Sequence, residues 1–253
     1  MRIGNMIGGT DKDFLEIVQK SQARKDDAAL RIKYYQDEQG EDTLRLIRQK
    51  WSRPEDFRLF CINLVRKLTD KRATVYQRAP VRTFEGGMSQ EVGEQLYAAM
   101  NADVVLKRAS RLTKLLKTTA LRVAWTGDSP TLHVVTPNIL DVVQSAPERP
   151  DRVIVTYPGE RQTDTRYADW TKTSFTMRDY RGSPIRVEGN EKAINPYGAL
   201  PFVPVFDRYP DDRFFLPGGD DLIEAQRAVN VALSNLWRAV ELQAHGQAWA
   251  TGV

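Results

Sequence analysis

The stretch Leu121-Arg-Val-Ala-Trp-Thr-Gly-Asp-Ser-Pro-Thr-Leu-His-Val-Val135 decides the fold class, because the pattern changes there from helical to extended. Two runs rich in β-branched and aromatic residues, 121–125 and 131–135, flank Gly127-Asp-Ser-Pro130. This composition is typical of a β-hairpin. We therefore predict that a helical part ends at residue 119 and that an antiparallel, β-rich part begins at Ala120.

Similar short runs follow the hairpin, at residues 152–157, 165–170, 173–180 and 184–189. Turn-forming pairs such as Pro158-Gly159 and Arg181-Gly182 separate them, and no strand alternates with a helix. The sequence therefore predicts a small antiparallel meander. A further strand is expected at Leu200–Phe206, where two prolines favour an edge or irregular position.

The first 119 residues read as helices. We expect one from Asp11 to Gln36, ended by Gly40, a second from Asp42 to Gln49, and one or two between Ser89 and Thr118. Another is predicted to open at Ser52, which is spaced from Glu55 as in a capping box. Its apolar face follows steps of three and one through Phe57, Phe60, Cys61, Leu64, Val65 and Leu68.

A long helix is expected from Asp220-Asp221 almost to the terminus, because acidic residues suit the positive end of a helix dipole. An apolar stripe runs along it through Leu222, Ala225, Val229, Leu233, Leu236 and Val240. This stripe is expected to face either the core or a partner. The predicted class is α+β, with a helical part (1–119), a β-rich part (120–218) and a long C-terminal helix (219–253).

Composition places the chain among ordinary globular proteins, with 253 residues, 41% hydrophobic and 28% charged. No apolar run is long enough for a membrane span, and the N-terminus lacks the apolar core of a signal peptide. We expect a location in a virion or in the cytoplasm. The single cysteine, Cys61, is expected to pack in the core.

Charge is distributed unevenly along the chain. Residues 1–125 carry 24 Lys and Arg against 16 Asp and Glu, whereas the remaining residues carry 13 against 17. A basic run lies in the last N-terminal helical region, at Lys107, Arg108, Arg111, Lys114 and Lys117. These side chains would contact DNA phosphates, face a neighbouring subunit or lie in solvent.

No catalytic arrangement is apparent in the sequence. The histidines His133 and His245 lack a nucleophile or carboxylate context, and the paired glycines do not form a phosphate-binding motif. A magnesium site would need the acids Asp207, Asp211, Asp212, Asp220 and Asp221. We predict no catalytic, cofactor or metal site and hence no enzyme; a metal-dependent nuclease is the least favoured alternative, after a nucleic-acid-binding virion or adaptor protein.

Two stretches of the sequence share a pattern with a known family. The first runs from Arg31 to Val81 and has a tyrosine pair, a nearby Gly40 and the helix Asn63–Asp70, before Tyr76 and Pro80; the second runs from Asn195 to Ser234. The residues that carry the likeness are Tyr34, Tyr35, Asn63, Asp70, Asn195, Pro196, Gly198, Pro201, Asp221, Asn230 and Ser234. With them, both stretches resemble the N-terminal wing part of the portal proteins of tailed bacteriophages.

The resemblance implies a ring of identical subunits, commonly a dodecamer, at one capsid vertex. Such a ring is the head-tail connector through which double-stranded DNA is packaged and ejected. The implied partners are the terminase large subunit, the major capsid protein and head-tail adaptor or tail proteins. Portal chains continue into a stem, clip and crown that this sequence lacks, so we expect either a fragment or a shortened relative.

Overall fold

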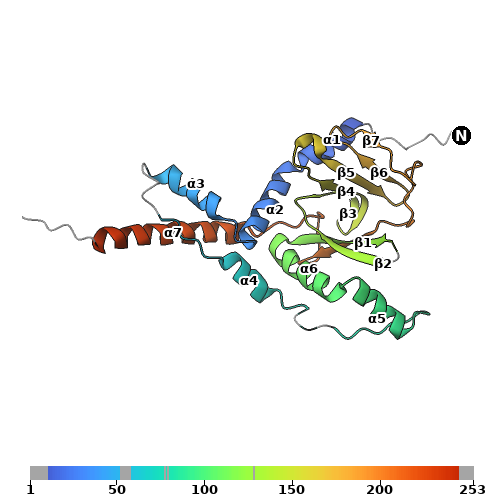
Figure 1. Cartoon of the computed structure of the whole chain (residues 1–253), viewed down its shortest axis with the longest axis horizontal. Helices are drawn as coiled ribbons and strands as arrows, with labels where there is room; N and C mark the ends of the chain where they lie inside the picture. Colours follow the sequence, from blue (N-terminus) through green and yellow to red (C-terminus); the bar gives the residue numbers. More distant parts are fainter. Residues whose placement is uncertain (1–10, 52–57, 77, 79, 128, 245–253) are drawn as a thin grey trace, which may run out of the picture. The chain divides into compact units, whose positions relative to one another are not determined.

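The computed structural model describes residues 11–51, 58–76, 78, 80–127 and 129–244. They form helices and antiparallel sheets, which confirms the predicted α+β class (Figure 1). The chain divides into two compact units: unit 1 comprises Met1–Ala29 and Arg72–Pro217, and unit 2 comprises Leu30–Lys71 and Gly218–Val253. This division differs from the three consecutive parts predicted, since the helical part supplies residues to both units.

Unit 1 contains two antiparallel sheets. The first has the order β2-β1-β8, with β1 at Thr118–Thr126, β2 at Ser129–Val135 and β8 at Phe202–Phe206. The second is the predicted meander, β3-β4-β5-β6-β7, with β3 at Leu140–Ala146, β4 at Arg149–Tyr157, β5 at Arg166–Thr171, β6 at Phe175–Arg178 and β7 at Pro184–Ile185. A short 3-10 helix, η2 (Gln162–Asp164), lies between β4 and β5.

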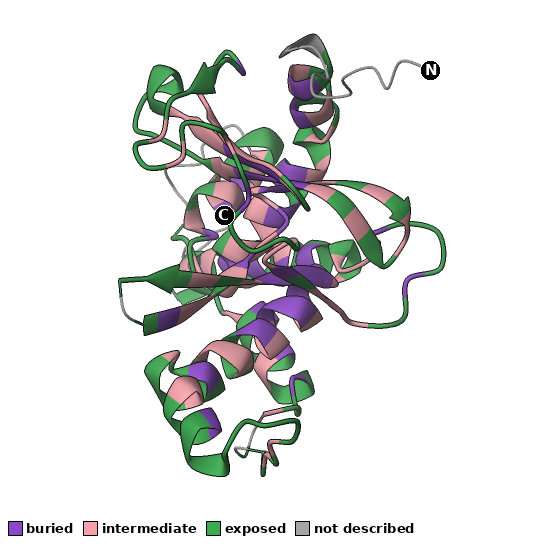
Figure 2. Ribbon diagram, turned by 90° about the vertical axis from the view of Figure 1, so that its right-hand side faces the viewer, coloured by how far each residue is buried: buried purple, intermediate pink, exposed green. Residues whose placement is uncertain are grey.

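The hairpin β1–β2 is not part of the meander, and β3 was not predicted. Leu140–Ala146 was missed because an aspartate, Asp141, occupies a buried position in it and the run holds few β-branched residues. The most buried parts of the strands are continuous: Thr118–Leu121 in β1, Val153–Val155 in β4 and Ala168–Trp170 in β5. Figure 2 shows the buried residues in purple. The main core of unit 1 lies around Leu140, Val153, Val155, Trp170 and Phe202.

Strand β8 is an edge strand, as its prolines predicted. The amide of Asp207 bonds to the carbonyl of Lys117, and the carbonyl of Pro201 accepts the amide of Val123. Odd-numbered residues of this segment therefore direct their backbone groups toward β1, so Pro204 faces the open edge. Its missing N–H lies on the side of β8 where the described part of the chain places no partner strand, and this makes further pairing at that edge less favourable.

The helices of unit 1 are α1 (Asp11–Lys20), the first turns of α2 (Gln22–Tyr35), α5 (Gln90–Ala99) and α6 (Ala102–Leu116). Ser89 caps α5 by accepting the amide of Val92. The region between Ser89 and Thr118 forms two helices, because Asn101 adopts a left-handed conformation with φ of 52°. Helix α6 packs on the first sheet.

Unit 2 contains the rest of α2, α3 (Gly40–Lys50), α4 (Leu64–Arg72, of which Arg72 belongs to unit 1) and the predicted long helix α7 (Asp220–Ala244). Two helix boundaries were wrong: the first predicted helix breaks at Ser21, and Gly40 begins α3 instead of ending a helix. The helix predicted to open at Ser52 is confirmed only from Leu64 onward, as α4, and is wrong over residues 58–63, which are not helical. Ser52, Glu55, Phe57 and His245 lie outside the described residues.

Candidate assembly surface on helix α7

One side of α7 carries a row of buried polar side chains. Gln226, Asn230 and Ser234 are spaced four residues apart and therefore lie on the same side of the helix. Their exposed fractions are 1%, 0% and 0%. Buried polar groups need hydrogen-bond partners, so this row must face a segment that supplies them.

The partner is the extended segment of residues 58–63, which we call the strap. Amides of the strap and of the first residue of α4 bond to the row at alternate positions. The bonds run from the amides of Phe60, Ile62 and Leu64 to the side-chain oxygens of Ser234, Asn230 and Gln226, at 3.0, 3.2 and 2.7 Å. Four residues of a helix rise about 6 Å, and two residues of an extended chain about 6.6 Å. Every fourth side chain of α7 therefore lies level with every second amide of the strap.

Gln226 makes the closest set of contacts in this row. Its oxygen accepts the amides of both Leu64 and Val65, and its Nε2 donates to the carbonyl of Ile62 at 2.6 Å. The side-chain amide of Gln226 therefore both accepts from and donates to the backbone of residues 62–65, as the peptide group of a neighbouring strand would. Gln226 was not singled out in the sequence, although its four-residue spacing from Asn230 and Ser234 was visible there.

Helix α4 begins where the strap ends. Asn63 caps it, with Oδ1 accepting the amide of Arg66 at 2.8 Å and Nδ2 donating to the carbonyl of Tyr35 at 3.3 Å. The hydroxyl of Tyr35 donates to Asp70 at 2.6 Å. Three residues of the portal-like pattern thus meet around α4, where their contacts fix local structure.

At the start of α7, Arg31 forms an ion pair with Asp220, while Asp221 is exposed in the first turn. Both acids lie near the positive end of the helix dipole, as predicted.

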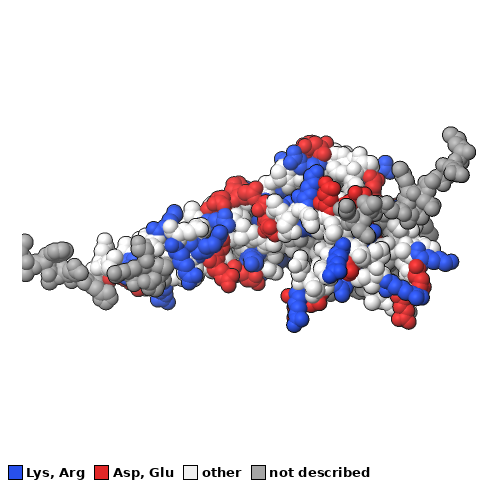
Figure 3. Space-filling view, turned by 90° about the horizontal axis from the view of Figure 1, so that it is seen from above, with Lys and Arg blue, Asp and Glu red and all other residues white. Residues whose placement is uncertain are grey.

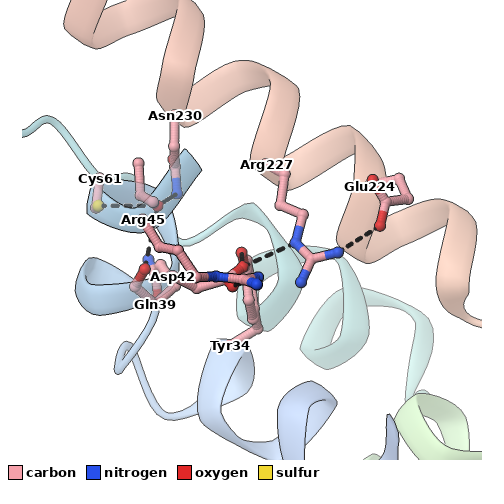
Figure 4. Close-up of polar contacts among 9 residues, drawn as sticks. Tyr34, Gln39, Asp42, Arg45, Cys61, Glu224, Arg227 and Asn230 are labelled. Carbon is pink, nitrogen blue, oxygen red and sulfur yellow. Dashed lines mark hydrogen bonds and ion pairs between the residues drawn. The ribbon is translucent and has the colours of Figure 1, made fainter. Parts of the chain in front are cut away.

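The carboxylate of Asp42 accepts hydrogen bonds from three side chains next to α7 (Figure 4). It accepts the hydroxyl of Tyr34 at 2.6 Å, the Nε of Arg227 at 2.8 Å and a guanidinium nitrogen of Arg45 at 2.5 Å. Arg227 also pairs with Glu224 at 2.5 Å. Burial by itself raises the pKa of Asp42, but the bonds from Arg227, Tyr34 and Arg45 outweigh it and hold that pKa below its ordinary value. The carboxylate form thereby stabilises unit 2.

The depressed pKa of Asp42 predicts a pH-dependent contribution to stability. We expect Asp42→Asn to lower the free energy of unfolding by roughly 2 kcal/mol at pH 7, because charge-assisted hydrogen bonds are lost. The carboxylate contribution is complete above the unfolded-state pKa of about 3.9. It disappears as the pH falls through the lower folded-state pKa. The deficit should therefore shrink below about pH 4, as measured by urea denaturation across pH.

The exposed Asp221→Asn is the matched control: it loses only a helix-dipole interaction, which contributes about 0.3–1 kcal/mol at the surface, so its deficit should be clearly smaller than that of Asp42→Asn. An equal deficit for Asp42→Asn at pH 7 and at low pH would contradict the electrostatic explanation.

The apolar side of α7 points away from the core of unit 2. We call it the outer face: Leu222, Ala225, Val229, Ala232, Leu233, Leu236, Ala239 and Val240. None is buried, and Leu236 and Val240 are 61% and 48% exposed. The stripe predicted to face either the core or a partner therefore does not form the core of unit 2. The residues of α7 that are buried are Ile223, Gln226, Asn230, Val231 and Ser234.

The basic run on α6 does not act as one surface. Lys114 and Lys117 both pair with Asp207, at 2.5 and 3.1 Å. Burial raises the pKa of Asp207, but the bonds from the two lysines bring it below its ordinary value. Arg111 is half-buried, which leaves Lys107 and Arg108 as the exposed members. On the face drawn in Figure 3, charges of both signs are intermixed.

The turn at Asn195–Gly198 serves a structural purpose in unit 1. The buried Asn195 donates to the carbonyls of Thr171 and Ala199 at 2.8 and 2.9 Å and accepts the amide of Tyr197. Pro196 lies inside the turn, and Gly198 has φ of 63°, which favours glycine. Pro201 offers its carbonyl to β1. These four residues of the portal-like pattern shape the approach to β8.

Among the described residues, no group of three or more His, Cys, Asp or Glu side chains could hold a metal ion. Of the acids considered for magnesium, Asp212 pairs with Arg213, and Asp207 and Asp220 have the partners given above. His133 is exposed on β2. Cys61 is half-buried rather than in the core, and burial raises the pKa of its thiol.

No protein-family model and no curated protein matches this chain. Within the described part of the chain, no helix is both long and apolar enough to cross a membrane.

Proposed function

We propose that this chain is a non-enzymatic subunit of a ring-shaped assembly, of the kind formed by phage portal proteins. The observation that carries the proposal is the outer face of α7, an apolar surface of a folded unit whose members are all exposed or half-buried among the described residues, with Leu236 and Val240 at 61% and 48%.

The outer face has the properties of a surface that packs against another helix. From Leu222 to Val240 it spans about 27 Å at the usual helical rise. The side chains of Glu224, Arg227, Arg238 and Glu241 lie toward the other sides of the helix, so no charge interrupts it. Its alanines allow close approach of a second helix, with valine and leucine filling the space between them. Extended apolar patches on soluble proteins mark interaction sites.

In this proposal, identical subunits bury their outer faces in a closed cyclic assembly, because repeated heterologous contacts close a ring when the rotation permits it. Double-stranded DNA would pass through the ring during packaging and ejection at the capsid vertex. The terminase large subunit, the major capsid protein and head-tail adaptor or tail proteins would contact it from outside.

The test is native mass spectrometry and negative-stain imaging of the purified chain and of Leu236→Lys. We expect closed rings, of about a dozen copies if the portal resemblance extends to stoichiometry, for the unaltered protein. We expect dissociated subunits for the variant, since burying an unpaired charge at a helix contact costs more than about 2 kcal/mol. The variant should keep its melting temperature as a subunit, because Leu236 is exposed there.

Glu241→Lys changes a charge on another side of the same helix. Glu241 forms only a long ion pair with Arg238, at 3.9 Å, so this variant should assemble normally. A monomeric wild-type chain, or rings that survive Leu236→Lys, would count against the proposal.

The nucleic-acid-binding alternative rests on Lys107 and Arg108. If it holds, replacing both with glutamate should abolish salt-dependent DNA binding without altering assembly.

A further inference from the structure

The strap is the place where sequence pattern and structure disagree. The apolar spacing through Phe60, Cys61, Leu64 and Val65 is that of one helical face, yet α4 begins only at Leu64. Such conflicts between local preference and global fold concentrate at functional elements. The strap also leaves Ile62 partly exposed, at 38%, so side-chain burial alone does not hold it against α7.

Two arrangements satisfy the same backbone amides. In the structure, Gln226 accepts the amides of Leu64 and Val65, the first two residues of α4. If α4 extended toward its N-terminus, these amides would bond instead to the carbonyls four residues earlier, those of Phe60 and Cys61. The exchange replaces one side-chain oxygen, Oε1 of Gln226, with two backbone carbonyls. Both amides keep an acceptor in either arrangement, whereas the side chains of Gln226 and Asn63 give up their bonds to the carbonyl of Ile62 and the amide of Arg66.

The rest of the strap responds differently. In an extended α4, the amides of Phe60 and Ile62 would fall in the first helical turn, where no backbone acceptor is available. They would leave Ser234 and Asn230, so the polar row of α7 would lose these two amide donors.

We infer that the strap is a switch between two conformations: docked along the polar row of α7, and wound into an N-terminal extension of α4. The inference depends on the fold of unit 2 and does not require the proposed assembly function. The polar row is thus a reversible docking site for extended backbone, in which Gln226 sets the residue at which α4 begins.

The test is hydrogen exchange at single-residue resolution, by mass spectrometry with electron-transfer fragmentation, on Gln226→Ala. Removal of Gln226 takes the acceptor from two amides, those of Leu64 and Val65. If the strap winds into α4, both amides find new acceptors and their protection stays within roughly tenfold of the wild type, while the amides of Phe60 and Ile62 lose theirs. If α4 only frays, the amides of Leu64 and Val65 exchange roughly a hundredfold faster or more, which overturns the inference.

Gln243→Ala, an exposed glutamine of the same helix, is the matched control and should leave all four amides unchanged. The unaltered protein gives an independent reading should Gln226→Ala fail to fold. If the strap opens by winding into α4, the amides of Phe60 and Ile62 should exchange at least about tenfold faster than those of Leu64 and Val65. Equal rates at the four positions would mean that the strap is simply released, and the switch would be rejected.

Discussion

Asp141→Ala is expected to lower the free energy of unfolding by about 3–5 kcal/mol, because it removes the anion from a buried charge cluster. Asp141 is 1% exposed on β3, and the ammonium of Lys25, itself 5% exposed, lies 2.5 Å from its carboxylate. Arg24 pairs with the same carboxylate at 2.8 Å. Without Asp141, two cations of α2 remain beside the sheet with no counter-ion. Urea denaturation followed by tryptophan fluorescence measures the loss.

Two companion variants separate charge from packing. Asp212→Ala breaks the exposed pair with Arg213 and should leave the denaturation midpoint where it was, because solvent screens such pairs. Asp141→Leu combined with Lys25→Met should recover part of the loss, since an apolar pair needs no counter-ion. If the double variant is as unstable as Asp141→Ala, the unpaired charge of Lys25 is not the source of the loss.

The sequence predicted those elements whose pattern depends on neighbours along the chain. The hairpin around Gly127 and the edge character of β8 were confirmed, and the helix expected from Ser89 begins at Gln90, with Ser89 as its cap. Each rests on turn chemistry, on the missing amide of proline or on a side-chain cap, and these act over a few residues. Local rules suffice there because tertiary contacts do not oppose them.

The errors arose where distant residues decide the outcome. The apolar residues of the strap have helical spacing. Its amides nevertheless bond to the side chains of Asn230 and Ser234, which lie about 170 positions later in the chain. Likewise, the apolar stripe of α7 was expected to face either the core or a partner, and its spacing did not show that Gln226, Asn230 and Ser234 lie among the buried residues instead. A pattern of hydrophobic residues identifies a helical face but does not state which partner covers it. The sequence also did not show that each unit is built from two separate segments of the chain, because the contacts that join those segments are between residues far apart in sequence.

The residues that carry the portal resemblance have mostly structural contacts in this chain. Asn63 caps a helix, Tyr35 bonds to Asp70, and Asn230 binds the strap. The positions of the portal-like pattern therefore matter to the fold, whereas the outer face of α7 follows from the helical spacing of its apolar residues. The proposal of a ring-forming subunit depends on that exposed apolar surface.

Asn195→Ala is expected to lower the free energy of unfolding by about 3 kcal/mol, because each buried carbonyl that loses its donor costs roughly 1–3 kcal/mol. The side-chain amide of Asn195 joins the end of β5, through Thr171, to the turn that precedes β8, through Ala199. Asn195 is only 4% exposed, so water has little room to replace its side-chain amide. The loss should appear as a lower melting temperature with the α7 contacts intact.

Asn190→Ala is the matched control for this prediction. Asn190 also makes two hydrogen bonds, both to Ile194 at 3.0 Å, but they are exposed and water substitutes for them. We expect a change of less than about 1 kcal/mol. Equal effects of the two substitutions would show that the stability of this turn comes from its backbone conformation, including the positive φ of Gly198, and not from the buried amide of Asn195.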